Sequence, residues 1–79
     1  MREMEFKMER TGLLEVGDLL PVVENKVSNS YYYTLGHAYA MSANYSTLER
    51  LVSREGKVVE VEETPKGFFV KVLFDEDVK

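Results

Sequence analysis

Apolar residues recur at every second position through the C-terminal third of the chain. Val59 and Val61 alternate with glutamates. Four further apolar residues then follow at every second position: Phe68, Val70, Val72 and Phe74. A period of two with β-branched and aromatic residues is typical of β-strands. Between the two runs, residues 64–67 read Thr-Pro-Lys-Gly, which suits a type I turn. The pattern therefore predicts a β-hairpin with strands over residues 57–63 and 67–74.

The second strand of this hairpin carries apolar residues on both faces. Phe69 and Leu73 add to the alternating set, as expected for a strand that is covered on both sides. The N-terminal residues 3–9 also alternate, with methionine and phenylalanine on one face and charges on the other. We therefore expect a small three-stranded antiparallel sheet, with residues 67–74 in the middle and the N-terminal strand on the far side.

One main helix is expected before the hairpin. Residues 46–49 read Ser-Thr-Leu-Glu and fit a capping box, and Gly56 stands where a glycine commonly follows a helix. An apolar stripe with helical spacing precedes that glycine: Leu35, Ala38, Met41, Tyr45, Leu48 and Val52. The pattern predicts a helix that ends near Glu55 and begins either at Ser46 or, with the capping box a chance match inside it, near Ser30 or His37.

The first half of this segment also permits a strand. Over residues 31–41 large side chains alternate with smaller ones, and tyrosine favours strands, whereas the alanines favour helix. We favour the helix, so the expected fold class is α+β, with the helix packed on the sheet. Residues 11–30 are apolar but broken by glycine and proline. There we expect a short helical turn near residues 16–20 or a short strand near residues 22–24.

Part of the sequence resembles SH3-like small β-barrels. Residues 56–61 read Gly-Lys-Val-Val-Glu-Val and, with residues 67–74, resemble a hairpin of such barrels. Val16-Gly17-Asp18 before an apolar run is also common in them. The resemblance covers under half of the chain and is to a fold, not to a family. It implies an alternative architecture, an SH3-like small β-barrel with an inserted helix.

The small size and the composition narrow the class of protein. The chain has 79 residues, no cysteine and one histidine, which excludes a disulfide scaffold and a thiolate metal site. We expect a single domain over residues 1–79, and small domains without disulfides often rely on oligomerisation. The net charge of −4 argues against nucleic acid as a partner. The N-terminus lacks the apolar core of a secretory signal, so we expect a cytoplasmic protein.

The charges stop altogether between Val27 and Leu48. This segment contains all five tyrosines and the histidine, and it is too polar to be a membrane span. Tyrosine is enriched in protein interfaces and can also wall a ligand site. We therefore expect the binding residues to include this segment and the second face of strand 67–74: Tyr31, Tyr32, Tyr33, His37, Tyr39, Phe69 and Leu73.

Two functions are compatible with these residues. The first is a small non-catalytic interaction module, homodimeric, that binds a partner protein through the tyrosine-rich segment. The alternative is a domain that binds a small molecule of nucleotide or amino-acid type in a site walled by Tyr31, Tyr33, His37 and Tyr39. No P-loop, GxGxxG, HExxH or GxSxG motif occurs in the sequence. We therefore expect no catalytic residue, no metal ligand and no cofactor.

Overall fold

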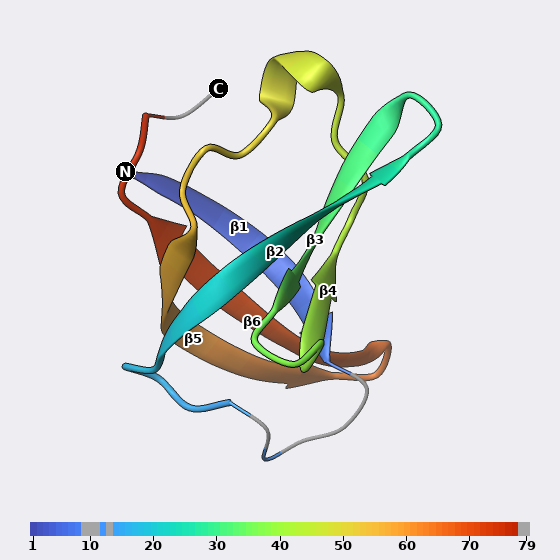
Figure 1. Ribbon diagram of the computed structural model, residues 1–79. Helices are drawn as coiled ribbons and strands as arrows, with labels where there is room; N and C mark the ends of the chain where they lie inside the picture. The colour runs from blue at the N-terminus through green and yellow to red at the C-terminus, as the bar shows by residue number, and fades with distance from the viewer. Residues whose placement is uncertain (9–11, 13, 78–79) are drawn as a thin grey trace.

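Six antiparallel strands close into a barrel in this protein (Figure 1). The computed structural model describes residues 1–8, 12 and 14–77. The strands are β1 (Arg2–Met8), β2 (Leu19–Val27), β3 (Ser30–Leu35), β4 (Ala40–Ser42), β5 (Glu55–Thr64) and β6 (Gly67–Phe74). Their order around the barrel is β1-β4-β3-β2-β5-β6, and β6 pairs with β1 to close it.

The predicted hairpin and N-terminal strand are confirmed. β5 and β6 pair through a turn at Thr64–Gly67, and β1 lies on the other side of β6 along its whole length. Glu9, at the end of the predicted first strand, lies outside the described residues. Alternate residues of β1 and β6 fill the barrel interior: Met4, Phe6, Met8, Val70, Val72 and Phe74. Because each fully buried side chain of this kind contributes roughly 1.5–3 kcal/mol, these two strands form the centre of the core.

The expectation of an α+β fold with a three-stranded sheet is wrong, because the predicted main helix does not form and β2, β3 and β4 extend the sheet into a closed barrel. The first half of the segment predicted as helix is β3 and β4, joined by a turn in which Gly36 and Ala38 have positive φ angles of 56° and 62°. Within the described residues the helical structure amounts to one 3₁₀ turn, η1 (Thr47–Glu49). The expected capping box is absent there, since the Ser46 hydroxyl donates to the Glu49 side chain at 3.1 Å and caps no backbone N–H.

The pairing of β3 with β2 and β4 explains why this segment forms strands and not a helix. Tyr33 and Leu35 alternate with exposed or half-buried neighbours and are both fully covered inside the barrel. A helix turns by about 100° per residue, so it would have placed these two side chains about 200° apart and could not have buried both against β2 and β4. The SH3-like barrel alternative fits the closed all-β architecture, with the single turn η1 in place of its inserted helix.

Gly56 has a role in the barrel that differs from the predicted helix stop. It lies in β5, opposite Leu20 of β2, and is buried. A Cβ atom at this position would lie 2.5 Å from both Val72 Cγ1 and Phe74 Cε1. Because Gly56 has no side chain, β5 can approach Val72 and Phe74 of β6 closely.

β2 is longer than the short strand predicted near residues 22–24. It begins directly after a tight turn in which the Asp18 N–H donates to Glu15 O at 3.1 Å, so the predicted helical turn near residues 16–20 is wrong. Thr11 and Leu13 of the preceding segment lie outside the described residues. No helix among the described residues has the length and apolar character needed to cross a membrane.

Candidate interaction site

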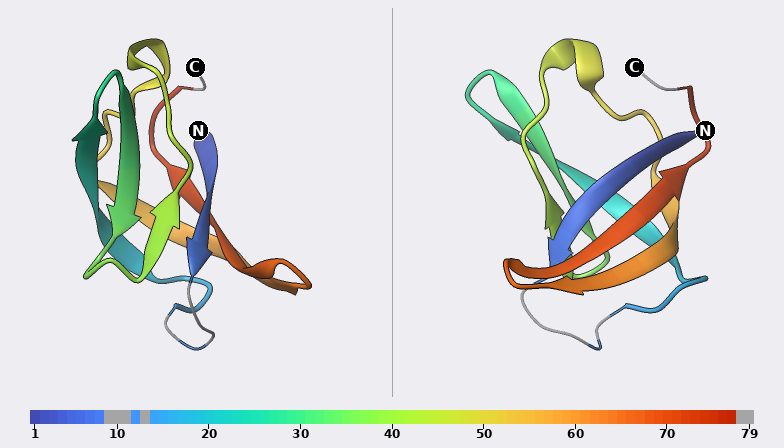
Figure 2. Two further views of the ribbon diagram at one scale, coloured as in Figure 1. Left: turned by 90° about the vertical axis from the view of Figure 1, so that its right-hand side faces the viewer. Right: turned by 180° about the vertical axis from the view of Figure 1, so that it is seen from behind.

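A strap of residues 43–54 links β4 to β5 and crosses one end of the barrel (Figure 2). This is the end at which β1 begins and β6 ends (Figure 1). Apart from η1 and one bridge between Tyr31 and Tyr45, the strap has no regular secondary structure. Its position therefore depends on contacts with the barrel, chiefly with two carboxylates, Glu24 of β2 and Glu76 beyond β6.

On the β2 side, Glu24 and Tyr33 hold the strap. Arg50 donates two hydrogen bonds to the Glu24 carboxylate, from Nε at 2.8 Å and from Nη2 at 2.6 Å. The Tyr33 hydroxyl donates to Glu24 Oε2 at 3.0 Å and accepts the backbone N–H of Leu51 at 2.7 Å. The Arg50 guanidinium also lies 4.7 Å from the centroid of the Tyr31 ring. The forked ion pair and the ring contact together fix the direction of the arginine.

Beyond the end of β6, Glu76 holds the next residues of the strap. Its Oε1 accepts the backbone N–H groups of Val52 at 3.0 Å and Ser53 at 2.7 Å, and the Ser53 hydroxyl at 2.6 Å. Arg2 lies 3.5 Å from Glu76 Oε2 and donates to the Glu49 carbonyl oxygen at 2.6 Å. The side chains of Arg2 and Glu76 are only 7% and 11% exposed, so this cluster is largely shielded from solvent.

The protonation of these groups suits a structural role. The hydrogen bonds from Arg50 lower the pKa of Glu24 and outweigh the effect of burial. Burial acts to raise the pKa of Glu76, but the hydrogen bonds from Ser53 and Val52 bring it below the usual value. Burial raises the pKa of Tyr33. At neutral pH both carboxylates are therefore ionised acceptors and Tyr33 is a protonated donor, and none of them is poised for acid–base catalysis.

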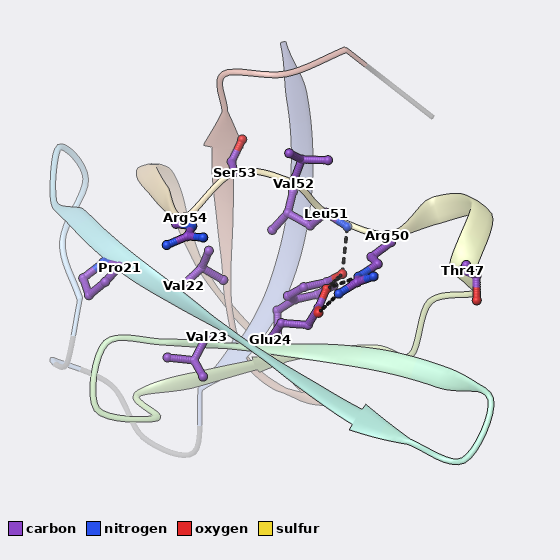
Figure 3. Close-up of a pocket in the computed structure, with 11 residues that line it drawn as sticks. Pro21, Val22, Val23, Glu24, Thr47, Arg50, Leu51, Val52, Ser53 and Arg54 are labelled. Carbon is purple, nitrogen blue, oxygen red and sulfur yellow. Dashed lines mark hydrogen bonds and ion pairs between the residues drawn. The ribbon is translucent and has the colours of Figure 1, made fainter.

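A groove of about 840 Å³ runs between β2 and the strap (Figure 3). Residues 21–24 of β2 form one wall, residues 50–54 of the strap form the other, and Tyr33 also lines it. Val23 is 48% exposed and Val52 is 72% exposed, so apolar side chains stand uncovered on both walls. The groove thus combines apolar walls with a polar cluster whose hydrogen bonds are already made within the chain.

The backbone of β2 is open beside this groove. Neighbouring residues of a strand direct their N–H and C=O groups alternately to the two sides. Pro21 O accepts the Gly36 N–H at 2.8 Å beyond the end of β3, whereas the Val22 N–H donates to Arg54 O at 2.8 Å on the β5 side. The alternation directs the backbone groups of Glu24 and Lys26 to the β5 side as well. β5 pairs with β2 only along Leu19–Pro21, so among the described residues no strand lies beside Glu24–Lys26 on the β5 side.

The predicted tyrosine site is divided between different parts of the barrel. Tyr33 is buried and lines the groove, and Tyr31 is half-buried beneath Arg50. Tyr32 is half-buried on the opposite side of β3, where it pairs with Asn25 of β2. Only Tyr31 and Tyr33 are therefore brought together at the strap.

His37 and Tyr39 lie in the turn between β3 and β4. Their rings make an edge-to-face contact with centroids 5.9 Å apart, and Tyr39 packs against the core while His37 is exposed. Neither residue lines the groove beside the strap. The four side chains that were expected to wall a small-molecule site therefore do not form one wall there.

Phe69 and Leu73 are half-buried in β6, at positions that alternate with its buried residues. Phe69 lies opposite Lys7 of β1, which in turn lies opposite Met41 of β4. Phe69 and Met41 line a second groove, of about 640 Å³, on this side of the barrel. Closure of the barrel, not a covering helix, thus places the second face of β6 on the outside of the molecule.

The residues that hold the strap could not be identified from the sequence. Glu24 and Arg50 are 26 positions apart, and Arg2 and Glu76 are 74 positions apart, so no local spacing links either pair. Within the described ranges, no group of three or more histidine, aspartate or glutamate side chains is placed to hold a metal ion. No protein-family model, curated protein or solved structure matches this chain.

Proposed function

We propose that this protein is a non-catalytic interaction module that binds an extended segment of a polypeptide along the open edge of β2. The observation that supports the proposal is that, within the described ranges, the backbone groups of Glu24 and Lys26 have no strand partner on the β5 side, directly beside a groove with exposed apolar walls. An extended segment added there would exchange hydrogen bonds with Glu24 and Lys26, as in other cases of strand addition. Its alternate side chains would meet Val23 on β2 or Val52 on the strap.

The polar cluster of the groove favours a peptide over a small polar ligand. Glu24, Tyr33 and Arg50 already satisfy one another, so a small ligand would have to displace hydrogen bonds made within the chain. The open backbone groups lack such partners and gain them when a strand is added. The tyrosine-rich segment contributes to this function through Tyr33, which positions the strap. The cytoplasmic location stays a prediction from the sequence.

A proline substitution tests strand addition directly. Lys26→Pro removes an N–H that points away from β3, so the β2–β3 ladder keeps its bonds while the edge loses a donor. We expect linear peptides selected on the wild-type protein from a random library to bind Lys26→Pro about five- to tenfold more weakly, given the roughly 1–1.5 kcal/mol of a lost hydrogen bond. Lys26→Ala, which removes the lysine side chain but keeps the backbone N–H, is the matched control and should bind within a few-fold of wild type.

The binding surface can be mapped in the same experiment. Amide chemical-shift changes on addition of a selected peptide should centre on residues 23–27 and 50–54. Selected peptides that bind Lys26→Pro as tightly as wild type, or that perturb the groove around Met41 and Phe69, would contradict the proposal.

A further inference from the structure

The open segment of β2 is complementary to itself. Residues 23–27 read Val-Glu-Asn-Lys-Val, a sequence whose charges are reversed about the central Asn25. When two such segments run antiparallel about Asn25, Glu24 of each copy lies opposite Lys26 of the other, and each Val23 lies opposite a Val27. Oppositely charged pairs and β-branched pairs directly across two antiparallel strands are both stabilising.

The backbone directions select the same register. In antiparallel strands the residues of a hydrogen-bonded pair must both point toward the partner. Glu24 and Lys26 both point away from β3, so pairing Glu24 with Lys26 of a second copy makes four N–H···O bonds about the two-fold axis. Two neighbouring registers also have a two-fold axis and keep the same backbone directions. One places Lys26 opposite Lys26, and the other places Glu24 opposite Glu24. Each of them therefore brings like charges together.

We propose that two copies of this chain associate through β2, antiparallel about Asn25, to join their barrels edge to edge. The proposal rests on the open edge that underlies the proposed function, and it identifies the bound segment as β2 of a second copy. The Glu24 side chain lies on the same side of β2 as Arg50, so Lys26 of the second copy approaches a carboxylate that already accepts two hydrogen bonds from Arg50.

Other edges of the barrel are less suited to pairing with themselves. β5 extends beyond its contacts with β2, and this part carries three glutamates, Glu60, Glu62 and Glu63. Two copies paired there would place negative charges side by side, a common device against edge-to-edge association. On β2 the extent of pairing is limited, because Arg54 occupies the position opposite Val22. The dimer is therefore small and reversible.

Molecular mass as a function of concentration tests the association. In sedimentation equilibrium the wild-type mass should rise from 9.1 kDa toward twice that value between roughly 10 μM and about 1 mM, the range expected for a small, weak interface. Lys26→Glu places glutamates opposite each other and should remain a monomer throughout. Lys66→Glu makes the same charge change in the β5–β6 turn and should associate like wild type. A wild-type protein that remains a monomer at about 1 mM, or Lys26→Glu associating as wild type does, would overturn the proposal.

Disulfide trapping tests the register without depending on charge. The chain has no cysteine, so a single introduced cysteine can cross-link only to another copy. In the proposed register the two Asn25 Cα atoms are about 4.5 Å apart, within the range for a disulfide, whereas the two Val23 positions are about 13 Å apart. Asn25→Cys should form an oxidised dimer at least about tenfold faster than Val23→Cys, because only the former pair meets the geometric requirement. Equal rates would overturn the register.

The two proposals fail in different ways. If wild type stays monomeric but selected peptides still lose affinity for Lys26→Pro, the strand-adding edge stands and its occupant is another polypeptide. If peptides bind Lys26→Pro as tightly as wild type, strand addition itself is wrong. Circular dichroism of each variant confirms that a loss of association reflects the edge and not unfolding.

Discussion

Gly56 shows how a single missing side chain controls closure of the barrel. It is buried in β5 where that strand passes over the ends of β6, and a Cβ atom there would overlap Val72 and Phe74. Both neighbours belong to the buried core, so neither can move aside at low cost. The requirement is one of space and not of backbone conformation.

Substituting this glycine should therefore destabilise the fold. We expect Gly56→Ala to reduce the free energy of unfolding by about 1–3 kcal/mol, the usual cost of overpacking a core. Urea denaturation followed by circular dichroism measures the change. Lys57→Ala, at the exposed neighbouring position, should change the unfolding free energy by less than about 0.5 kcal/mol. Equal stability of wild type and Gly56→Ala would show that the barrel closes less tightly than the structure indicates.

Tyr33 is the second residue on which the architecture depends. Its ring is 1% exposed, and its hydroxyl both donates to Glu24 and accepts the N–H of Leu51. It thus joins the barrel core to the strap through one oxygen atom.

Removal of that oxygen isolates its contribution. Tyr33→Phe keeps the ring but leaves the Leu51 N–H without its acceptor, so we expect a loss of about 1–3 kcal/mol in the free energy of unfolding. Tyr32→Phe, on the other face of the same strand, is the control and should have a much smaller effect. Similar losses in the two variants would argue against a specific role of the Tyr33 hydroxyl.

At the scale of elements, the strap is held mainly by side chains and the barrel by backbone pairing. Glu76 accepts three hydrogen bonds from Val52 and Ser53, while Glu24 holds Arg50 two residues earlier in the chain. Because the two anchors bind different residues of the strap, loss of one should release only part of it.

Local release of the strap is measurable by hydrogen exchange. Glu76→Ala removes the acceptor of the Val52 and Ser53 amides, so their protection should fall by at least about tenfold, as expected from 1.4 kcal/mol or more of lost hydrogen bonding. Amides of β1 and β6 should retain their protection unless global stability also falls. Asp77→Ala, at an exposed position one residue later, is the matched control. Unchanged exchange at Ser53 would contradict the anchoring role of Glu76.

At the scale of the whole molecule, the two anchors couple the end of the barrel to pH. The pKa values of Glu24 and Glu76 are both lower in the folded protein than their usual values. The unfolded chain therefore binds more protons than the folded chain in acid, and the stability that these groups contribute is lost as the pH falls through their folded pKa values.

Because these two pKa values are lowered by folding, the protein should lose stability in acid. The melting temperature should be nearly constant above about pH 5 and fall below about pH 4, where glutamates begin to protonate in unfolded chains. Glu76→Gln should start from a lower melting temperature at pH 7 and fall less steeply in acid. Parallel profiles for wild type and Glu76→Gln, measured by circular dichroism, would show that Glu76 does not contribute to the acid dependence.

The alternation of apolar and polar residues determined those strands whose local pattern agrees with the pairing they make in the barrel. β1, β5 and β6 follow from it because a period of two leaves one apolar face that a sheet can bury. The same reasoning placed Phe69 and Leu73 on the second face of β6, opposite its buried residues.

Only the tertiary structure decided the path of residues 30–54. Tyrosine and alanine there have conflicting local preferences, and the barrel resolved the conflict by pairing β3 with β2 and β4, which buries Tyr33 and Leu35 in the core. The strap anchors and the open edge of β2 likewise depend on which strands fail to pair. An amino-acid sequence specifies side chains and their periodicity. Which backbone groups remain without a partner depends on where every other strand ends, and that is a property of the folded barrel alone.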